Sequence, residues 1–90
     1  MYIISFTGAF KKDYKRCIKR KYNLTLLQKS IEILELTGRL PPNYRPHKLS
    51  GDYTDCWECH IQADWLLIWL QNEDKKELTF IRTGTHADLF

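Results

Sequence analysis

The sequence lacks the features that mark secreted and membrane proteins. No stretch approaches the roughly 18 consecutive apolar residues that a membrane span needs. The opening run, residues 1–10, is apolar, but it has no basic region before it and no cleavage site after it, so it does not resemble a signal peptide. The three cysteines are an odd number, which argues against a disulfide framework. We therefore expect a cytoplasmic protein with reduced thiols and no membrane partner.

Internal repeats and low-complexity tracts are also absent, and the chain has only 90 residues. A chain of this length forms one small domain and buries only about two-thirds of the surface that it exposes when unfolded. We therefore expect residues 1–90 to form a single domain with a modest core.

Positive charge is concentrated in the first half of the chain. Residues 1–51 carry eleven Lys or Arg against three Asp or Glu, whereas residues 52–90 carry three against eight. Seven of the basic residues lie between Lys11 and Lys21, where Asp13 is the only acidic residue. This density favours contact with nucleic-acid phosphates, although docking to an acidic protein or a solvated helix face would explain it equally well.

The hydrophobic pattern changes period along the first half of the chain. Residues 2–7 alternate as a strand does, and Gly8 ends them. Two helical segments follow, of which the second begins at a cap formed by Asn23 or Thr25 and ends at Gly38. The apolar face of the first helix is formed by Phe10, Tyr14, Cys17 and Ile18, and that of the second by Leu24, Leu27, Ile31 and Leu34.

Three prolines make residues 40–51 an extended loop. Beyond it we predict three strands, at residues 52–60, 65–70 and 77–83, and a short tail at residues 85–90. The middle strand of the three is apolar on both faces, as a central, covered strand should be. The order β-α-α-β-β-β predicts an α+β fold, in which a helical hairpin packs on one face of a small, mostly antiparallel sheet and the first strand lies at an edge.

Four groups able to transfer protons lie at strand ends and in loops. His47 lies in the proline-rich loop, His60 and Asp64 flank a turn, and His86 lies in the tail. Imidazole exchanges protons near neutral pH, and a carboxylate can orient an imidazole or act as a base. A three-residue turn at residues 61–63 would place His60 opposite Asp64, whereas a two-residue turn would not. The plain alternative is that these side chains are merely solvated.

Further residues near these groups suit contact with RNA. Arg82, near the end of the last predicted strand, is suited to holding a phosphate. Trp65 and Phe90 are suited to stacking on a base. The proline-rich loop adds the basic residues Arg45 and Lys48.

Cys56, Cys59 and His60 spell C-x-x-C-H, the attachment signature of c-type haem. They fall in a predicted strand, in which residues three apart point to opposite faces, so the two thiols cannot both reach one porphyrin or one metal ion. The three histidines and Asp64 are zinc-ligand types, but no motif fixes their geometry. We therefore expect no cofactor and no metal, and we expect the thiols to be small core or edge residues.

Three segments of the chain match a known family. They are P-H-K-L-S-G at residues 46–51, E-C-H-I-x-x-D-W-L-L-I at residues 58–68 and R-T-G-T-H-x-x-L-F at residues 82–90. In this order and spacing, the chain resembles the YafQ-type toxins of the RelE/ParE superfamily, the toxin halves of bacterial type II toxin–antitoxin pairs. The resemblance covers essentially the whole chain. Trp57, Ala63 and Trp69 depart from the residues common in relatives.

The resemblance implies a RelE-like, microbial-ribonuclease-like fold and an endoribonuclease, or mRNA interferase, that cleaves mRNA held in the ribosomal A site. It implies that His47, His60, Asp64 and His86 form the catalytic set, that Arg82 lies near the phosphate, and that Trp65 and Phe90 shape the site. The ribose 2′-OH would attack its own 3′-phosphate without a metal ion. We assign His86 as the acid, His47 or Asp64 as the base, and Arg82 and Lys48 as the stabilising cations.

The resemblance also implies partners. They are a cognate antitoxin whose acidic tail wraps the toxin and blocks the site, mRNA and ribosomal RNA, and promoter DNA only through the antitoxin complex. The alternative is a non-enzymatic toxin like those of the ParE branch, which share this fold and bind DNA gyrase. Such a binder has no need of three histidines and an aspartate near one end of the sheet.

Overall fold

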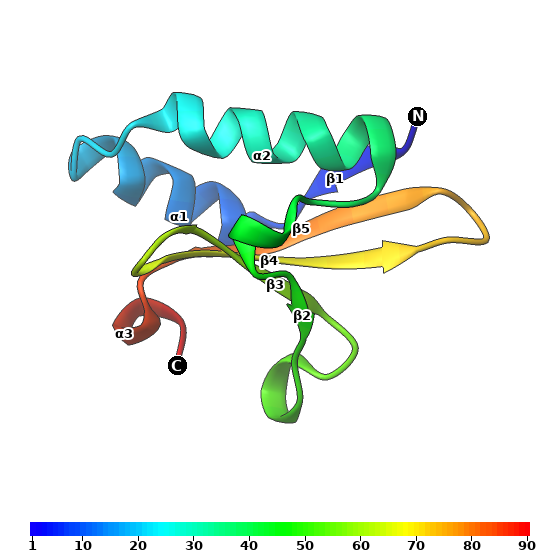
Figure 1. Ribbon diagram of the computed structural model, residues 1–90. Helices are drawn as coiled ribbons and strands as arrows, with labels where there is room; N and C mark the ends of the chain where they lie inside the picture. Colours follow the sequence, from blue (N-terminus) through cyan, green and yellow to red (C-terminus); the bar gives the residue numbers. More distant parts are fainter.

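The computed structural model describes all residues, 1–90, and its centre is a five-stranded sheet in the order β1-β5-β4-β3-β2 (Figure 1). Strand β1 pairs in parallel with β5, and every other neighbouring pair is antiparallel. The predictions of a mostly antiparallel sheet and of an edge position for the first strand are confirmed. The strands are β1 (Ile3–Phe6), β2 (His47–Lys48), β3 (Trp57–Gln62), β4 (Trp65–Asn72) and β5 (Glu77–Gly84).

Helices α1 (Gly8–Lys19) and α2 (Leu24–Thr37) form the predicted hairpin and cover one face of the sheet (Figure 1). The Thr7 side chain caps α1 by accepting a hydrogen bond from the Phe10 amide. The predicted caps of α2 are also confirmed, because Asn23 begins it and Gly38 ends it in the left-handed conformation. No helix combines the length and the apolar character that crossing a membrane requires.

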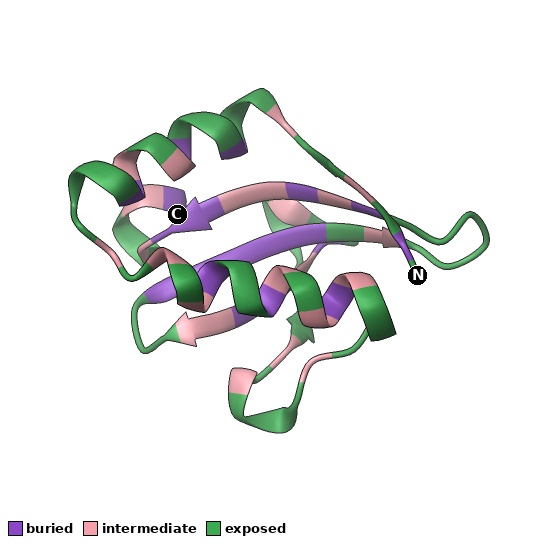
Figure 2. Cartoon of the chain, turned by 90° about the horizontal axis from the view of Figure 1, so that it is seen from above, coloured by how far each residue is buried: buried purple, intermediate pink, exposed green.

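Buried side chains form one cluster on each face of the sheet. The larger cluster lies under the helices and includes Cys59, and the smaller one, on the opposite face, includes Cys56. Strand β4 is buried along most of its length, as predicted (Figure 2). The prediction that the two thiols of C-x-x-C-H point to opposite faces is thus confirmed. Burial raises the pKa of Cys59 to about 12, as suits an unreactive core thiol.

Two predictions about buried positions need correction. Ile18, predicted to lie on the apolar face of α1, is 50% exposed, whereas the carboxylate of Asp13 is buried on that helix. The strand predicted at residues 52–60 begins only at Trp57. Residues Gly51–Tyr53 form a 3₁₀ turn, η2, and Asp55 adopts a left-handed conformation that interrupts any strand.

The proline-rich loop and the tail are more ordered than predicted. The loop contains a 3₁₀ turn, η1 (Pro42–Tyr44), and the two-residue strand β2. The tail forms a one-turn helix, α3 (His86–Leu89), on the sheet face opposite α1 and α2 (Figure 1). This helix and β2 bring two of the three histidines to the same face of the sheet.

Candidate active site

The three histidines gather on the sheet face that α1 and α2 leave open. His47 comes from edge strand β2, His60 from β3 and His86 from α3. The ring centroids of His47 and His60 are 6.4 Å apart, and those of His60 and His86 are 6.1 Å apart. Residues from three separate segments therefore form one continuous row of imidazoles.

Asp64 joins this row through His86 rather than through His60. Its Oδ1 lies 2.6 Å from His86 Nδ1 and accepts a 2.9 Å hydrogen bond from the His86 amide. These two contacts, the backbone one first, hold the pKa of Asp64 below its usual range. Asp64 thus remains a carboxylate that orients the His86 ring and leaves Nε2 of that ring facing away from it.

The turn between β3 and β4 differs from the one that would pair His60 with Asp64. Gln62 pairs with Trp65, so the turn has two residues, and His60 lies opposite Leu66. An irregularity in the register between His60 and Gln62 accompanies this turn. The His60 Nδ1 instead lies 3.3 Å from the Ala63 carbonyl oxygen.

Glu58 is a site residue that was not identified from the sequence. It lies opposite His47 in the sheet and is only 4% exposed, and its Oε1 is 3.2 Å from His47 Nε2. The other carboxylate oxygen, Oε2, is buried without a hydrogen-bond partner. The His47 Nδ1 lies 3.0 Å from the Arg45 carbonyl oxygen. Both ring nitrogens of His47 therefore face oxygens that accept hydrogen bonds.

Arg82 is held in place by the buried carboxylate of Asp13. In the sequence, Asp13 stands out only as the single acidic residue among the basic residues of the first helix. Asp13 Oδ2 accepts a 2.6 Å hydrogen bond from Arg82 Nε, and Asp13 Oδ1 accepts one of 3.0 Å from Nη2. This bidentate pairing raises the pKa of Arg82. The third nitrogen, Nη1, lies 3.4 Å from the Tyr53 hydroxyl, beside the ring of Phe90. The cation is thus anchored from α1 and reaches toward the open face.

The other predicted RNA-contacting residues have different positions. Phe90 is 64% exposed and lies 6.3 Å from the His86 ring, so its face is available for stacking. Trp65 is only 2% exposed and donates its indole N–H to Thr83 in the helix-side core, so it cannot stack on a base.

The two basic residues of the proline-rich loop differ in their relation to the histidine row. Lys48 points to the helix side, with Nζ 5.8 Å from the Trp57 ring centroid. Arg45 contributes its backbone carbonyl to His47, and its own side chain is exposed.

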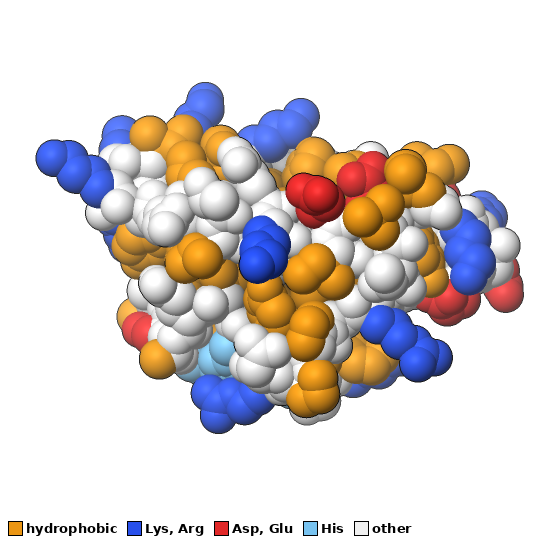
Figure 3. Space-filling view, turned by 45° about the horizontal axis from the view of Figure 1, so that its top comes forward, with side chains coloured by type: hydrophobic (Ala, Val, Ile, Leu, Met, Phe, Trp, Pro, Cys, Tyr) orange, Lys and Arg blue, Asp and Glu red, His pale blue; other side chains and the backbone are white.

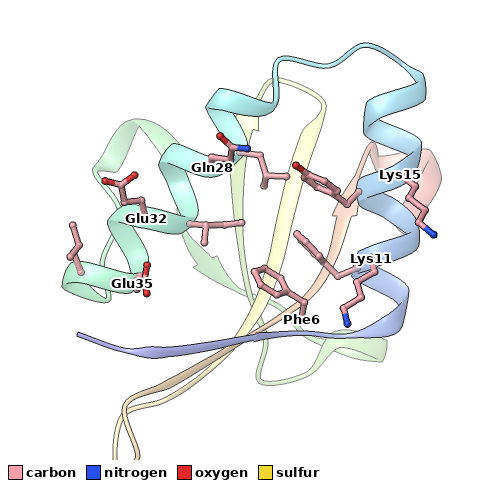
Figure 4. A pocket seen from close by; sticks show the side chains of 11 residues that line it. Phe6, Lys11, Lys15, Gln28, Glu32 and Glu35 are labelled. Atoms are coloured by element: carbon pink, nitrogen blue, oxygen red, sulfur yellow. The ribbon is translucent and has the colours of Figure 1, made fainter.

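A groove lies on the opposite, helix-covered side of the molecule. It has a volume of about 830 Å³ between α1 and α2, with an apolar floor that includes Phe6, Phe10 and Ile31. Lys11 and Lys15 follow one wall, and the other wall carries Gln28, Glu32 and Glu35 (Figure 4). Hydrophobic side chains reach the surface of this side among charged ones (Figure 3). No histidine lines the groove. Nowhere in the structure are three or more His, Cys, Asp or Glu side chains arranged to hold a metal ion.

A helical hairpin covers one face of the sheet and a row of histidines lies on the other, which together define an α+β domain with a candidate active site on its open face. The family model described as "Bacterial toxin of type II toxin-antitoxin system, YafQ" matches residues 2–90. The chain belongs to this YafQ family.

Relatives with known names agree with this assignment. The mRNA interferase toxin YafQ of Escherichia coli K12 is 36% identical over 88 residues, which cover 97% of this chain and 94% of that protein. A metal-bound toxin from Helicobacter pylori has a structure with a TM-score of 0.90 and 34% identity, covering all of both chains. In the E. coli DinJ–YafQ toxin–antitoxin complex, the matching chain gives a TM-score of 0.89 at 36% identity, covering 99% of this chain and 97% of that one.

Proposed function

We propose that this protein is an endoribonuclease that cleaves mRNA on the ribosome and thereby inhibits translation. The observation that carries the proposal is the pair of imidazoles His60 and His86, 6.1 Å apart, with Asp64 hydrogen-bonded to the second. Two imidazoles at this spacing can both reach one phosphodiester, one on each side of the phosphorus. That arrangement suits 2′-OH attack on the adjacent phosphate, which needs one base and one acid.

The hydrogen bonds favour a particular division of roles. His86 Nδ1 is held by the Asp64 carboxylate, which orients the ring and leaves Nε2 as the atom that protonates the leaving 5′-oxygen. His60 donates from Nδ1 to the Ala63 carbonyl, which leaves Nε2 free to accept the 2′-proton. This assignment gives the base role to His60, where we expected His47 or Asp64. His47 already faces Arg45 and Glu58, and Asp64 already faces His86. The products would be a 2′,3′-cyclic or 3′-phosphate and a 5′-OH.

The remaining groups stabilise charge and hold the substrate. Arg82 Nη1, 3.4 Å from the Tyr53 hydroxyl on the open face, is the proposed cation that stabilises the phosphorane-like state. His47, between the carbonyl of Arg45 and the carboxylate of Glu58, is a second donor at the other end of the row. The exposed ring of Phe90 is the proposed base-stacking surface. The ribosome would supply further orientation of the mRNA, and a cognate antitoxin, as for the E. coli relative crystallised with DinJ, is the proposed inhibitor.

Induced expression of the protein and of single variants tests the proposal in cells. We expect the wild type to arrest growth and to generate new mRNA 5′ ends, and His86→Ala or His60→Ala to lose both effects. Ala87→Ser, at the exposed neighbour of His86 in α3, is the matched control and should remain toxic. Full toxicity of both histidine variants would refute the nuclease proposal.

Purified components separate the competing mechanisms. Because every proton transfer is assigned to a side chain of this protein, we expect cleavage on programmed ribosomes to persist when the toxin is first freed of metal with a chelator selective for zinc and copper, at the Mg²⁺ concentration that ribosomes require. A loss of cleavage after this treatment that added zinc or copper restores would replace the proposal with a metal-dependent one. Inhibition of gyrase supercoiling without RNA cleavage would replace it with a ParE-like function.

A further inference from the structure

The position of His86 depends on a helix too short to be stable by itself. Helix α3 has four residues, and an isolated helix of that length does not form in water. It nevertheless carries His86 at its start, and Phe90 follows its end. Contacts to the rest of the molecule must therefore fix the orientation of the His86 ring.

Apolar packing supplies only one of these contacts. Leu89 is 7% exposed and packs with Leu66 and Ile68 on the open face of the sheet. The Leu89 carbonyl oxygen also accepts a 3.3 Å hydrogen bond from the Tyr53 hydroxyl. One buried leucine restrains the distance of α3 from the sheet but not its rotation, because dispersion contacts have little directionality.

Two carboxylates restrain the rotation of α3. Asp64 accepts a hydrogen bond from the His86 amide at the start of the helix, and Asp88 makes two kinds of contact near its end. Asp88 Oδ2 accepts a 2.9 Å hydrogen bond from the Thr85 amide, which closes the capping box that starts the helix. The same carboxylate receives a bidentate contact from Arg20, just beyond α1, with Oδ2 2.6 Å from Nη1 and Oδ1 3.0 Å from Nη2. Arg16 Nη1 lies 3.9 Å from Oδ1. The pKa of Asp88 is held far below its usual range, chiefly by the hydrogen bond from Arg20.

Gly84 makes the close approach of this carboxylate possible. A Cβ atom at this position would lie 2.9 Å from Asp88 Oδ2, closer than real Cβ contacts come. The chain therefore has no side chain at the point where Asp88 folds back over the end of β5.

We propose that Arg20 and Asp88 form a clamp that positions His86 for catalysis by tying α3 to the end of α1. The proposal rests on the proposed ribonuclease function and deepens it. Neither residue touches substrate, so both act indirectly, through the position of His86. The Arg20 side chain is 39% exposed, and exposed ion pairs contribute little to global stability. Small displacements of an acid from its phosphodiester, in contrast, slow catalysis by up to about a hundredfold. The clamp therefore affects the rate more than the stability.

A double-mutant cycle tests the clamp. The variants are Arg20→Gln, Asp88→Asn and the double variant, and the asparagine side chain keeps an oxygen for the Thr85 amide. We expect each single variant to lower the saturated single-turnover rate of mRNA cleavage on ribosomes by roughly tenfold. The toxin concentration for half-saturation should stay within about twofold of the wild-type value, because no substrate contact is removed. The double variant should be about as slow as either single one, since both break the same contact.

Two controls separate the positioning effect of Arg20 from the effect of its charge. Lys29→Gln, at an exposed position on α2, removes one positive charge from the opposite side of the molecule and should leave the rate unchanged. Arg20→Lys, which keeps the charge without the bidentate geometry, should recover part of the rate. Additive losses in the double variant, or an Arg20→Gln rate equal to that of Lys29→Gln, would overturn the clamp.

Hydrogen exchange of the His86 amide gives a readout that does not depend on activity. This amide donates to Asp64 only while α3 is correctly placed, so it should exchange faster in Arg20→Gln and Asp88→Asn than in the wild type. Unchanged exchange in both variants would refute the clamp even if the wild type cleaved no RNA. Absence of cleavage by the wild type on ribosomes would instead refute the proposed function.

Discussion

Among single residues, Glu58 is notable because its burial costs folding free energy and because it lies beside the histidines. A buried carboxylate oxygen without a partner costs free energy that an uncharged side chain would not. Its other oxygen lies 3.2 Å from His47, at the end of the imidazole row. We infer that Glu58 is present because it fixes the orientation of His47, and that it lowers the stability of the fold.

The variant Glu58→Gln separates these two effects, because glutamine has nearly the same shape and no charge. We expect cleavage on ribosomes to fall roughly tenfold or more, since His47 loses its carboxylate. We expect the free energy of unfolding, measured in urea, to change by less than about 1 kcal/mol or to increase, because an uncharged amide replaces a buried carboxylate of which one oxygen has no partner. Wild-type activity in Glu58→Gln would show that the carboxylate has no catalytic role.

The family resemblance predicted that the histidines form one set, but strand register decided the other positions. His47, His60 and His86 were predicted as a set, and the structure places their rings in one row. The side of the sheet that Trp65 faces was not decided from the sequence, because the two-residue turn and the irregular register after His60 set it. Trp65 consequently lies in the helix-side core.

At the scale of helices and strands, the sequence predicted the elements whose ends are set by neighbouring residues. It did not predict the elements that form only through contacts to distant residues. The second helix begins at one of the two caps predicted for it, Asn23, and ends at Gly38 as predicted, because both are short-range hydrogen-bonding effects. Helix α3 has four residues and forms only because Asp88 and Leu89 have distant partners. No periodicity can reveal such a helix.

Gly38 also determines how the end of α2 packs. Its φ of 72° is left-handed, and a Cβ atom there would overlap the Tyr2 hydroxyl group. Gly51 has a similar φ of 74°, but a Cβ atom added to it would meet open space, so it is a matched control. We expect Gly51→Ala to lower the free energy of unfolding by about 1 kcal/mol, from backbone conformation alone.

Gly38→Ala adds the overlap with Tyr2 to this backbone cost. We expect a loss of about 2–4 kcal/mol, since the ring of Tyr2 or the end of α2 must shift. Urea unfolding of both variants measures the difference. Equal losses would mean that the Tyr2 ring moves aside at no cost.

Over the whole molecule, the two faces of the sheet carry different kinds of functional side chain. The open face carries the histidines, Arg82 and Phe90, whereas the helix side carries most of the basic residues between Lys11 and Lys21. Only Arg16 and Arg20 of that basic segment have carboxylate partners, namely Asp13 and Asp88. The exposed lysines of α1 are therefore free to meet RNA phosphates on a face separate from the proposed mRNA site.

Removing two of these lysines should weaken binding without slowing the chemistry. In Lys12→Gln/Lys19→Gln, we expect the concentration of ribosomes needed for half-saturation to rise and the saturated cleavage rate to stay unchanged. The slope of log affinity against log salt concentration should fall by roughly 0.7–0.9 for each phosphate that the variant no longer neutralises. The matched control is Lys29→Gln/Lys75→Gln, which removes the same charge from exposed positions on α2 and the β4–β5 turn. If both double variants weakened binding equally, the effect would come from net charge, and α1 would not be a specific RNA-binding surface.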